Sequence, residues 1–143
     1  MKLHTIDLSP EFTHIYLLPI SDLHIGDPFC NIDKFLRYRK WIEDTPNAFI
    51  ILNGDIMNAA IKNSVSDVYA ETVTPNEQIK RAVELFTPVK DRILAVISGN
   101  HEHRIYKETG VDVTEIMAQQ LGVWYAGDEA FIKLRFGRKE KNK

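Results

Sequence analysis

Three apolar stretches of the chain each end in side chains that can bind a metal ion. Asp22 and His24 follow the first stretch, Asp55 follows the second, and Asn100 and His101 follow the third. A carboxylate together with an imidazole suits a divalent transition metal better than calcium or magnesium alone. These residue types and their repeated position therefore predict a site for divalent metal ions, with Asp22, His24, Asp55 and Asn100 as ligands.

The spacing within these stretches indicates what each side chain can do. Asp22 and His24 are two residues apart, so they point to the same side of an extended strand end. Asp55 adds a carboxylate that is able to bridge two cations, and Asn100 adds a neutral oxygen. One nitrogen and three oxygens are ample for one ion completed by water, but they are too few for two. His101 directly follows a ligand, where it is placed to donate a proton to a leaving group.

The apolar stretches also predict the elements that position these residues. Residues 15–20, 49–52 and 93–97 have the continuous apolar character of strands in a parallel sheet covered on both faces. Ligands of open α/β sheets bind just beyond the carboxyl ends of the strands. The order of strands and helices indicates an α/β fold with a central, mainly parallel sheet and flanking helices. Predicted helices begin at the capping residues Asn31, Thr74 and Asp112, and another covers about residues 101–107.

The remaining connections are predicted from local patterns. Residues 3–8 and 12–20 are expected to pair as a hairpin, with Pro19 at the strand end or facing an unpaired side because it has no amide hydrogen. Residues 56–62 are expected to form a short helix, and residues 64–72 a loop. Two further short strands are predicted at residues 124–126 and 130–136.

The composition is that of a soluble globular protein. Of the 143 residues, 44 % are apolar and 27 % are charged, which predicts a single domain over residues 1–143 with a real core. The formal net charge of −2 provides no general attraction to nucleic acid or an anionic membrane. Cys30 is the only cysteine, which excludes a disulfide framework and a cysteine-based zinc site. The sequence has no signal-peptide pattern and no run long enough to cross a membrane, so a cytoplasmic location is predicted.

The last residues suggest that the domain is cut short at its C-terminal end. Residues 130–136 alternate like a half-buried strand, and Gly137 with Arg138 resembles the start of a turn. Residues 139–143 are interpreted either as a frayed charged tail or as the beginning of a partner strand. A strand without its partner would expose an edge through which chains could associate.

The three ligand-bearing segments resemble the first three motifs of the calcineurin-like metallophosphoesterases. They are residues 22–26 (Asp-Leu-His-Ile-Gly), 54–58 (Gly-Asp-Ile-Met-Asn) and 99–102 (Gly-Asn-His-Glu). The resemblance implies an αββα sandwich, in which a two-layer β-sandwich is flanked by helices. It also implies two divalent metal ions that activate water for attack on a phosphoester substrate. Manganese is the expected metal, with iron, zinc, nickel or magnesium as alternatives.

The same resemblance implies a role for each candidate residue. Asp22 and His24 would hold the first ion, Asp55 would bridge the two ions, and Asn100 would hold the second. His101 would be the general acid near the scissile oxygen. The sequence therefore predicts a metal-dependent phosphoesterase.

Two departures from the family pattern narrow this prediction. The phosphoprotein-phosphatase branch has aspartate and arginine where this chain has Asn58 and Ala59, so a phosphodiester is favoured over a phosphoprotein. Asn58 can still orient His101 by a hydrogen bond. The family also takes metal-binding histidines from later motifs, including a Gly-His-x-His segment, but no histidine follows His103. The chain alone is therefore expected to be poorly active.

Two other functions also fit the sequence. A non-catalytic binding module could use the same fold, and a family nuclease acting on DNA or RNA is a further alternative. Arg104 is interpreted either as a contact to a substrate phosphate or as part of a surface ion pair. His103 is expected on the helix surface, because it lies on another face than His101. A basic group near the chain end is interpreted as a solvated tip or as a nucleic-acid contact: Arg135, Arg138, Lys139, Lys141 and Lys143.

Overall fold

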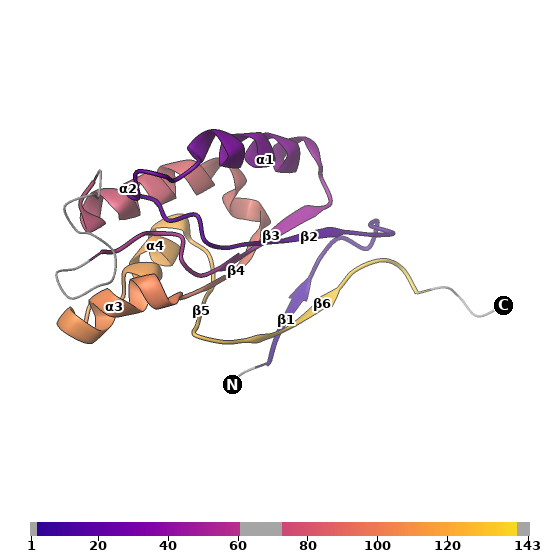
Figure 1. Ribbon diagram of the computed structural model, residues 1–143. Helices are drawn as coiled ribbons and strands as arrows, with labels where there is room; N and C mark the ends of the chain where they lie inside the picture. Colours follow the sequence, from indigo (N-terminus) through magenta and orange to yellow (C-terminus); the bar gives the residue numbers. More distant parts are fainter. Residues whose placement is uncertain (1–2, 61–72, 140–143) are drawn as a thin grey trace.

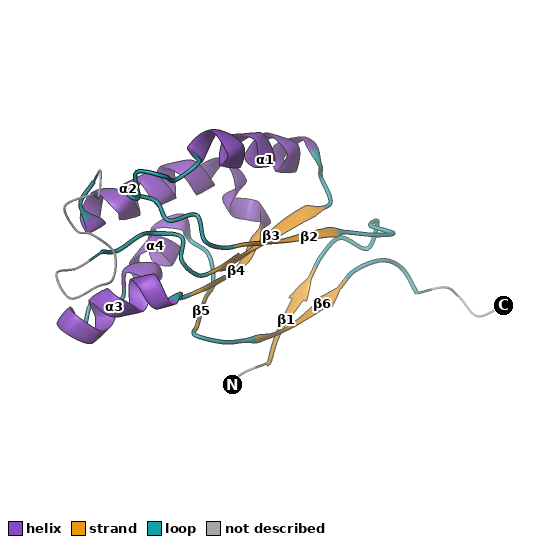
Figure 2. Cartoon of the chain, viewed as in Figure 1, coloured by secondary structure: helices purple, strands orange, loops and turns teal. Residues whose placement is uncertain are grey.

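The computed structural model describes residues 3–60 and 73–139 as a mixed α/β fold. Figure 1 shows the helices gathered on one side of the strands, and Figure 2 marks the helices, strands and loops. The elements in chain order are β1 (Leu3–Asp7), β2 (Tyr16–Ile20), α1 (Ile32–Asp44), β3 (Ala48–Asn53), α2 (Pro75–Phe86), the 3₁₀ helix η1 (Thr87–Arg92), β4 (Ile93–Ile97), α3 (Asn100–Thr109), α4 (Val113–Leu121), β5 (Tyr125–Gly127) and β6 (Phe131–Arg135).

Four strands form a parallel sheet in the order β2-β3-β4-β5. Ile50 of β3 and Val96 of β4 are completely buried in its centre. They belong to one apolar core with Ile42 of α1, Phe86 of α2 and Met117 of α4. Burial of these side chains is the main stabilising contribution to the layer of helices on the sheet. The predicted parallel sheet with flanking helices is confirmed.

The helices begin where the sequence predicts them. Gly110 and Gly122 have positive φ and end α3 and α4, as glycines commonly do at this position. Each predicted capping side chain accepts a hydrogen bond from the backbone N–H three residues further on: Asn31 from Lys34 at 2.9 Å, Thr74 from Glu77 at 3.3 Å, and Asp112 from Glu115 at 3.0 Å.

Strand β2 lies at the edge of the four-stranded sheet. The Tyr16 N–H donates to the Asn47 carbonyl at 2.9 Å, on the side of β3. Backbone groups of successive residues in a strand point to opposite sides, so the nitrogen of Pro19 faces the open edge. The prediction that Pro19 faces an unpaired side is confirmed.

The predicted hairpin between residues 3–8 and 12–20 is wrong. β1 pairs in parallel with β6, with Asp7 beside Arg135, and β2 pairs with β3. Both β1 and β6 alternate between exposed and half-buried residues. They therefore suit a two-stranded ribbon with one covered face, whereas the continuously apolar β2 suits the larger sheet. The strand predicted at residues 130–136 is present as β6, and it pairs with β1 on one of its edges.

The short helix predicted at residues 56–62 is wrong over residues 56–60. Met57 instead forms a parallel bridge to the segment after β2, and Ala59 has a positive φ of 50°. Two buried side chains accept the amide hydrogens that a helix would use, Glu102 from Met57 and Gln78 from Ala59. Residues 61–62 of that helix, the loop predicted at residues 64–72 and residues 140–143 of the chain end lie outside the described residues.

Within residues 3–60 and 73–139, none of the helices has the length and apolar character needed to cross a membrane.

Candidate metal centre

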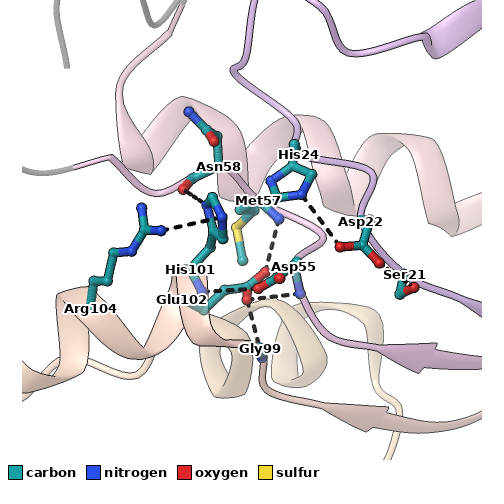
Figure 3. A network of polar contacts seen from close by, with 10 residues as sticks. All are labelled: Ser21, Asp22, His24, Asp55, Met57, Asn58, Gly99, His101, Glu102 and Arg104. Atoms are coloured by element: carbon teal, nitrogen blue, oxygen red, sulfur yellow. Dashed lines mark hydrogen bonds and ion pairs between the residues drawn. The ribbon is translucent and has the colours of Figure 1, made fainter. Parts of the chain in front are cut away.

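The candidate ligands lie where three neighbouring strands end (Figure 3). His24 follows β2, Asp55 follows β3, and His101 lies in the first turn of α3, shortly after β4. Each of these three residues can offer one ligand atom such that the three atoms lie within 4.8 Å of one another. The parallel sheet therefore brings together side chains that are far apart in the sequence. His101, which the sequence suggested as a proton donor beside the metal, is itself in this group.

Asp22 and Asn100, the two other predicted ligands, lie beside this group. Asp22 Oδ1 is 3.6 Å from His24 Nε2, and Asp22 Oδ2 accepts a hydrogen bond from Ser21 Oγ at 2.6 Å. The Asn100 amide lies against the Asp55 carboxylate, and with its nitrogen toward that group it donates to Oδ2 at 2.8 Å. The structure thus places every predicted ligand at one end of the sheet.

The loops that carry these side chains have an uncommon backbone conformation. Asp22, His24 and Asp55 have positive φ angles of 55°, 51° and 52°, a region that residues other than glycine seldom occupy. The extended strand end predicted for Asp22 and His24 is therefore wrong, because β2 ends at Ile20. Conformations with positive φ cost about 1–3 kcal/mol each and are concentrated at functional sites. The two loops hold each other in place, because the His24 N–H donates to the Asp55 carbonyl at 3.1 Å.

Glu102 fixes the position of the Asp55 loop, a role that the sequence did not reveal. Its carboxylate accepts hydrogen bonds from the backbone N–H groups of Asp55 at 3.1 Å, Met57 at 2.9 Å and Gly99 at 3.1 Å. Its side chain is almost completely buried, and this loss of hydration raises the pKa of Glu102 above its usual value. The sequence signal was its place three residues after Gly99, where a glutamate can accept from the N-cap backbone.

Two glycines allow the β3 and β4 loops to approach closely. Gly54 has a φ of 83°, and a Cβ added there would lie 2.7 Å from the Gly99 Cα. A Cβ added at Gly99 would lie 2.2 Å from both the backbone nitrogen and Oδ1 of Asp55. The site therefore needs a residue without a side chain at Gly99 for steric reasons.

Gly99→Ala is expected to destabilise the fold and displace Asp55. Overpacking of this kind costs about 1–3 kcal/mol or more, and here the clash falls on a candidate ligand. Gly122→Ala is the matched control, because Gly122 has a φ of 70° but open space around it. We expect the control to lower the free energy of unfolding by about 1–2 kcal/mol through backbone strain and to keep metal affinity. Chemical denaturation and metal-binding calorimetry measure both effects, and equal metal affinity in the two variants would contradict the prediction.

His101 is held by two hydrogen bonds that define its protonation. Nδ1 lies 2.7 Å from the backbone carbonyl oxygen of Asn58, and Nε2 lies 3.3 Å from Nη2 of Arg104 (Figure 3). A carbonyl only accepts and a guanidinium only donates, so Nδ1 carries the proton and Nε2 presents its lone pair. Asn58 thus orients His101 as predicted, but through its main chain, which any residue at this position could provide.

The structure also shows where the other polar residues named in the sequence analysis lie. Arg104 lies at the site, beside His101, whereas His103 stacks on Tyr106 with ring centroids 5.7 Å apart.

Arg135 forms two hydrogen bonds with Asp7, at 2.5 and 2.7 Å, and holds the pKa of that carboxyl below its usual value. Arg138 pairs with Glu11, and Lys139 is exposed, while Lys141 and Lys143 lie outside the described residues. Both described arginines near the chain end are thus neutralised by carboxylates, which weakens the case for a nucleic-acid contact there.

Gln78 is a second positioning residue that the sequence did not reveal. It lies completely buried on α2, accepts a hydrogen bond from the Ala59 N–H at 3.0 Å and donates to the Val73 carbonyl at 3.1 Å. It also packs so closely on Gly26 that a Cβ there would lie 2.5 Å from Gln78 Nε2. Gln78 therefore supports both loops of the site from the helix layer.

The donor set fits a divalent transition metal. His24 and His101 offer nitrogen, and Asp55 offers carboxylate oxygen, with the Asp22 carboxylate and the Asn100 amide next to them. Mixed imidazole and carboxylate ligands are typical of zinc, iron and manganese sites. His24 and Asp55, with Asp22 and Asn100 next to them, would hold the metal, and His101 lies close enough to act beside it.

Comparison with known proteins gives one match. A model of the calcineurin-like phosphoesterase family matches residues 17–139, which include every candidate ligand. No curated protein and no solved structure matches the chain. The matched range covers most of the sequence, so the chain belongs to the calcineurin-like phosphoesterase family.

Proposed function

We propose that the chain catalyses the metal-dependent hydrolysis of phosphodiesters at this centre. The observation that carries the proposal is the group of His24, Asp55 and His101, which lies within the range matched to the family. Family membership supports phosphoester hydrolysis in general. The preference for diesters, a pair of ions and manganese as the metal are the finer parts of the proposal.

Each residue has a role in this proposal. When bound, divalent ions would polarise the phosphoryl group and make the attacking water more acidic. Asp22 and His24 would hold one ion, Asp55 would be shared, and Asn100 would hold the other. His101 would give a proton to the leaving oxygen from Nε2, because its Nδ1–H is already donated to the Asn58 carbonyl. For this step Nε2 must first take up a proton from solvent and release its contact with Arg104 Nη2.

The segment after Asp55 supports a diester substrate. Alanine at position 59 carries no charge, and Ala59 is 1 % exposed, so this position offers a substrate no cationic contact. A phosphomonoester carries more negative charge than a diester and would gain more from an arginine there. The absence of a guanidinium at position 59 therefore disfavours a monoester more than a diester, although Arg104 still places one beside His101.

An assay of the whole chain tests the proposal. Because the later ligand motifs are missing from this chain, we expect slow hydrolysis of bis(p-nitrophenyl) phosphate with Mn²⁺, still slower hydrolysis of p-nitrophenyl phosphate, and loss of both activities with a chelator. Hydrolysis that persists unchanged in the chelator would rule out the metal mechanism, and faster hydrolysis of the monoester would rule out the diester preference.

His101→Gln separates the role of proton donor from that of ligand. Glutamine cannot protonate a leaving group, so we expect turnover to fall about 10²–10⁴-fold for a diester with a poor leaving group. The fall should be much smaller for p-nitrophenolate, which leaves without a proton. Mn²⁺ affinity, measured by calorimetry, should change little. A tenfold or greater loss of affinity, with equal rate losses for the two substrates, would assign His101 as a ligand.

A further inference from the structure

A cavity of about 920 Å³ adjoins the candidate metal centre. Asp22, His24 and His101 form part of its wall, so a molecule in the cavity lies next to the reacting groups. The rest of the wall comes from the edge strand β2, the turn after His24 and the N-terminal half of α1. This volume falls within the range of about 300–1,000 Å³ that is usual for clefts that hold small organic ligands.

Two aromatic side chains in the cavity wall are exposed. Phe29 is 94 % exposed and Tyr38 is 52 % exposed. The Phe29 ring is presented by an ordered turn, since its N–H donates to Asp27 Oδ1 at 2.7 Å and the Asp27 N–H donates to the His24 carbonyl at 3.0 Å. The Phe29 ring is apolar but exposed to water, in the same cavity wall as the candidate metal ligand His24. Because exposure gives up the stabilisation that burial would provide, this arrangement favours a role for the ring in binding another molecule.

The shape and chemistry of the wall favour a small planar occupant. A peptide strand added to β2 would need backbone donors at the open edge, but Pro19, which lines the cavity and faces that edge, has none. A flat ring can instead stack on Phe29 and Tyr38. Lys34, also in the wall, adds a positive charge suited to an anionic phosphoester.

We propose that this cavity binds a planar aromatic ester group of the substrate, which stacks on Phe29 and Tyr38. The inference rests on the proposed function, because the phosphate must lie at His24 and His101 for its ester group to enter the cavity. The substrate class is therefore phosphodiesters with an aryl group or a nucleobase. Stacking on an aromatic side chain tolerates either ring system, since both present a flat π-face.

Binding of phosphonates that cannot be hydrolysed tests this inference on the Mn²⁺-loaded chain. Phenylphosphonate is expected to bind about tenfold more tightly than methylphosphonate, with cyclohexylphosphonate between them because its ring is apolar but not planar. Phe29→Ala and Tyr38→Ala should each reduce the phenyl-to-methyl ratio and leave the affinity for methylphosphonate unchanged. Phe131→Ala is the control, because Phe131 is 61 % exposed on β6 and outside the cavity wall.

Cys30 supplies a second readout that requires no hydrolysis. It is the only cysteine of the chain and lines the same cavity. Burial raises the pKa of its thiol, so alkylation by a neutral maleimide is followed at mildly alkaline pH. Phenylphosphonate should slow this reaction several-fold in the unaltered chain and have little effect in Phe29→Ala.

The outcomes distinguish failure of the inference from failure of the proposed function. An affinity ratio of phenylphosphonate to methylphosphonate near one would contradict the proposal that the cavity binds an aromatic group. A ratio that Phe29→Ala and Tyr38→Ala leave unchanged would contradict it as well. If Mn²⁺-dependent hydrolysis of the diester persists in that case, the proposed function stands. If neither phosphonate binds and no hydrolysis occurs, both are overturned.

Discussion

Asp55→Asn is expected to abolish metal-dependent hydrolysis while leaving the fold intact. The substitution removes the charge of the one carboxylate in the group of His24, Asp55 and His101. Loss of an outer-shell partner already costs about 10–100-fold in metal affinity, and loss of a direct charged ligand should cost more. Asparagine can keep the hydrogen bond that Asp55 Oδ1 accepts from the His101 N–H at 2.9 Å. The loops should therefore stay in place.

Mn²⁺ calorimetry, turnover of bis(p-nitrophenyl) phosphate and thermal unfolding measure this result together. Asp44→Asn is the matched control, because it removes the same charge from an exposed side chain at the end of α1. The control should bind metal and turn over substrate like the unaltered chain. Full activity in Asp55→Asn would show that this carboxylate is not a ligand.

Glu102→Gln is expected to damage both stability and metal binding, although the two side chains have nearly the same shape. Both Glu102 oxygens accept from backbone N–H groups, one from Met57 and the other from Asp55 and Gly99. In either orientation, the glutamine amide group directs hydrogens at a backbone donor. A buried donor left without an acceptor costs about 1–3 kcal/mol, and the displaced Asp55 loop should lower metal affinity about 10–100-fold.

The pH dependence of stability gives a specific signature of Glu102. Burial raises the folded-state pKa of Glu102 above its usual value of 4.5, so the folded chain binds this proton more tightly than the unfolded chain. The contribution is fully present below pH 4.5 and is lost as the pH rises through the folded pKa. In metal-free protein, the stability advantage over Glu102→Gln should therefore shrink as the pH rises through this window.

Denaturation at several pH values, with a chelator present, measures this difference. Glu108→Gln is the control, since Glu108 is exposed on the same helix α3. It should change neither the stability nor its pH dependence by much. A Glu102→Gln variant as stable as Glu108→Gln, with unchanged Mn²⁺ affinity, would show that the three backbone contacts do not position the site.

Elements with a strong local pattern could be predicted from the sequence. The short, β-branched apolar run of β4 favours a buried strand, and the caps at Asn31, Thr74 and Asp112 satisfy backbone donors within their own helix. Such signals depend on residues a few positions apart, so they survive without knowledge of the fold.

Elements defined by distant partners could not be predicted. The partner of β1 is β6, at the other end of the described chain, and adjacency in sequence favoured a hairpin instead. Residues 56–60 have an acceptable helical composition, but the buried side chains of Glu102 and Gln78 accept the amide hydrogens of Met57 and Ala59. Tertiary hydrogen bonds to buried acceptors outweighed the weak local preference.

The sequence by itself determined the chemistry available to this protein. It placed Asp22, His24, Asp55, Asn100 and His101 after apolar strands, and parallel strands bring such ends to one edge of a sheet. Only the tertiary structure decided which contacts hold these side chains in position. Glu102 meets the Asp55 amide across 47 positions of sequence, and the Asn58 carbonyl meets His101 across 43. These contacts depend on the close approach of Gly54, after β3, to Gly99, after β4. The distance between these two loops is set only when the chain folds.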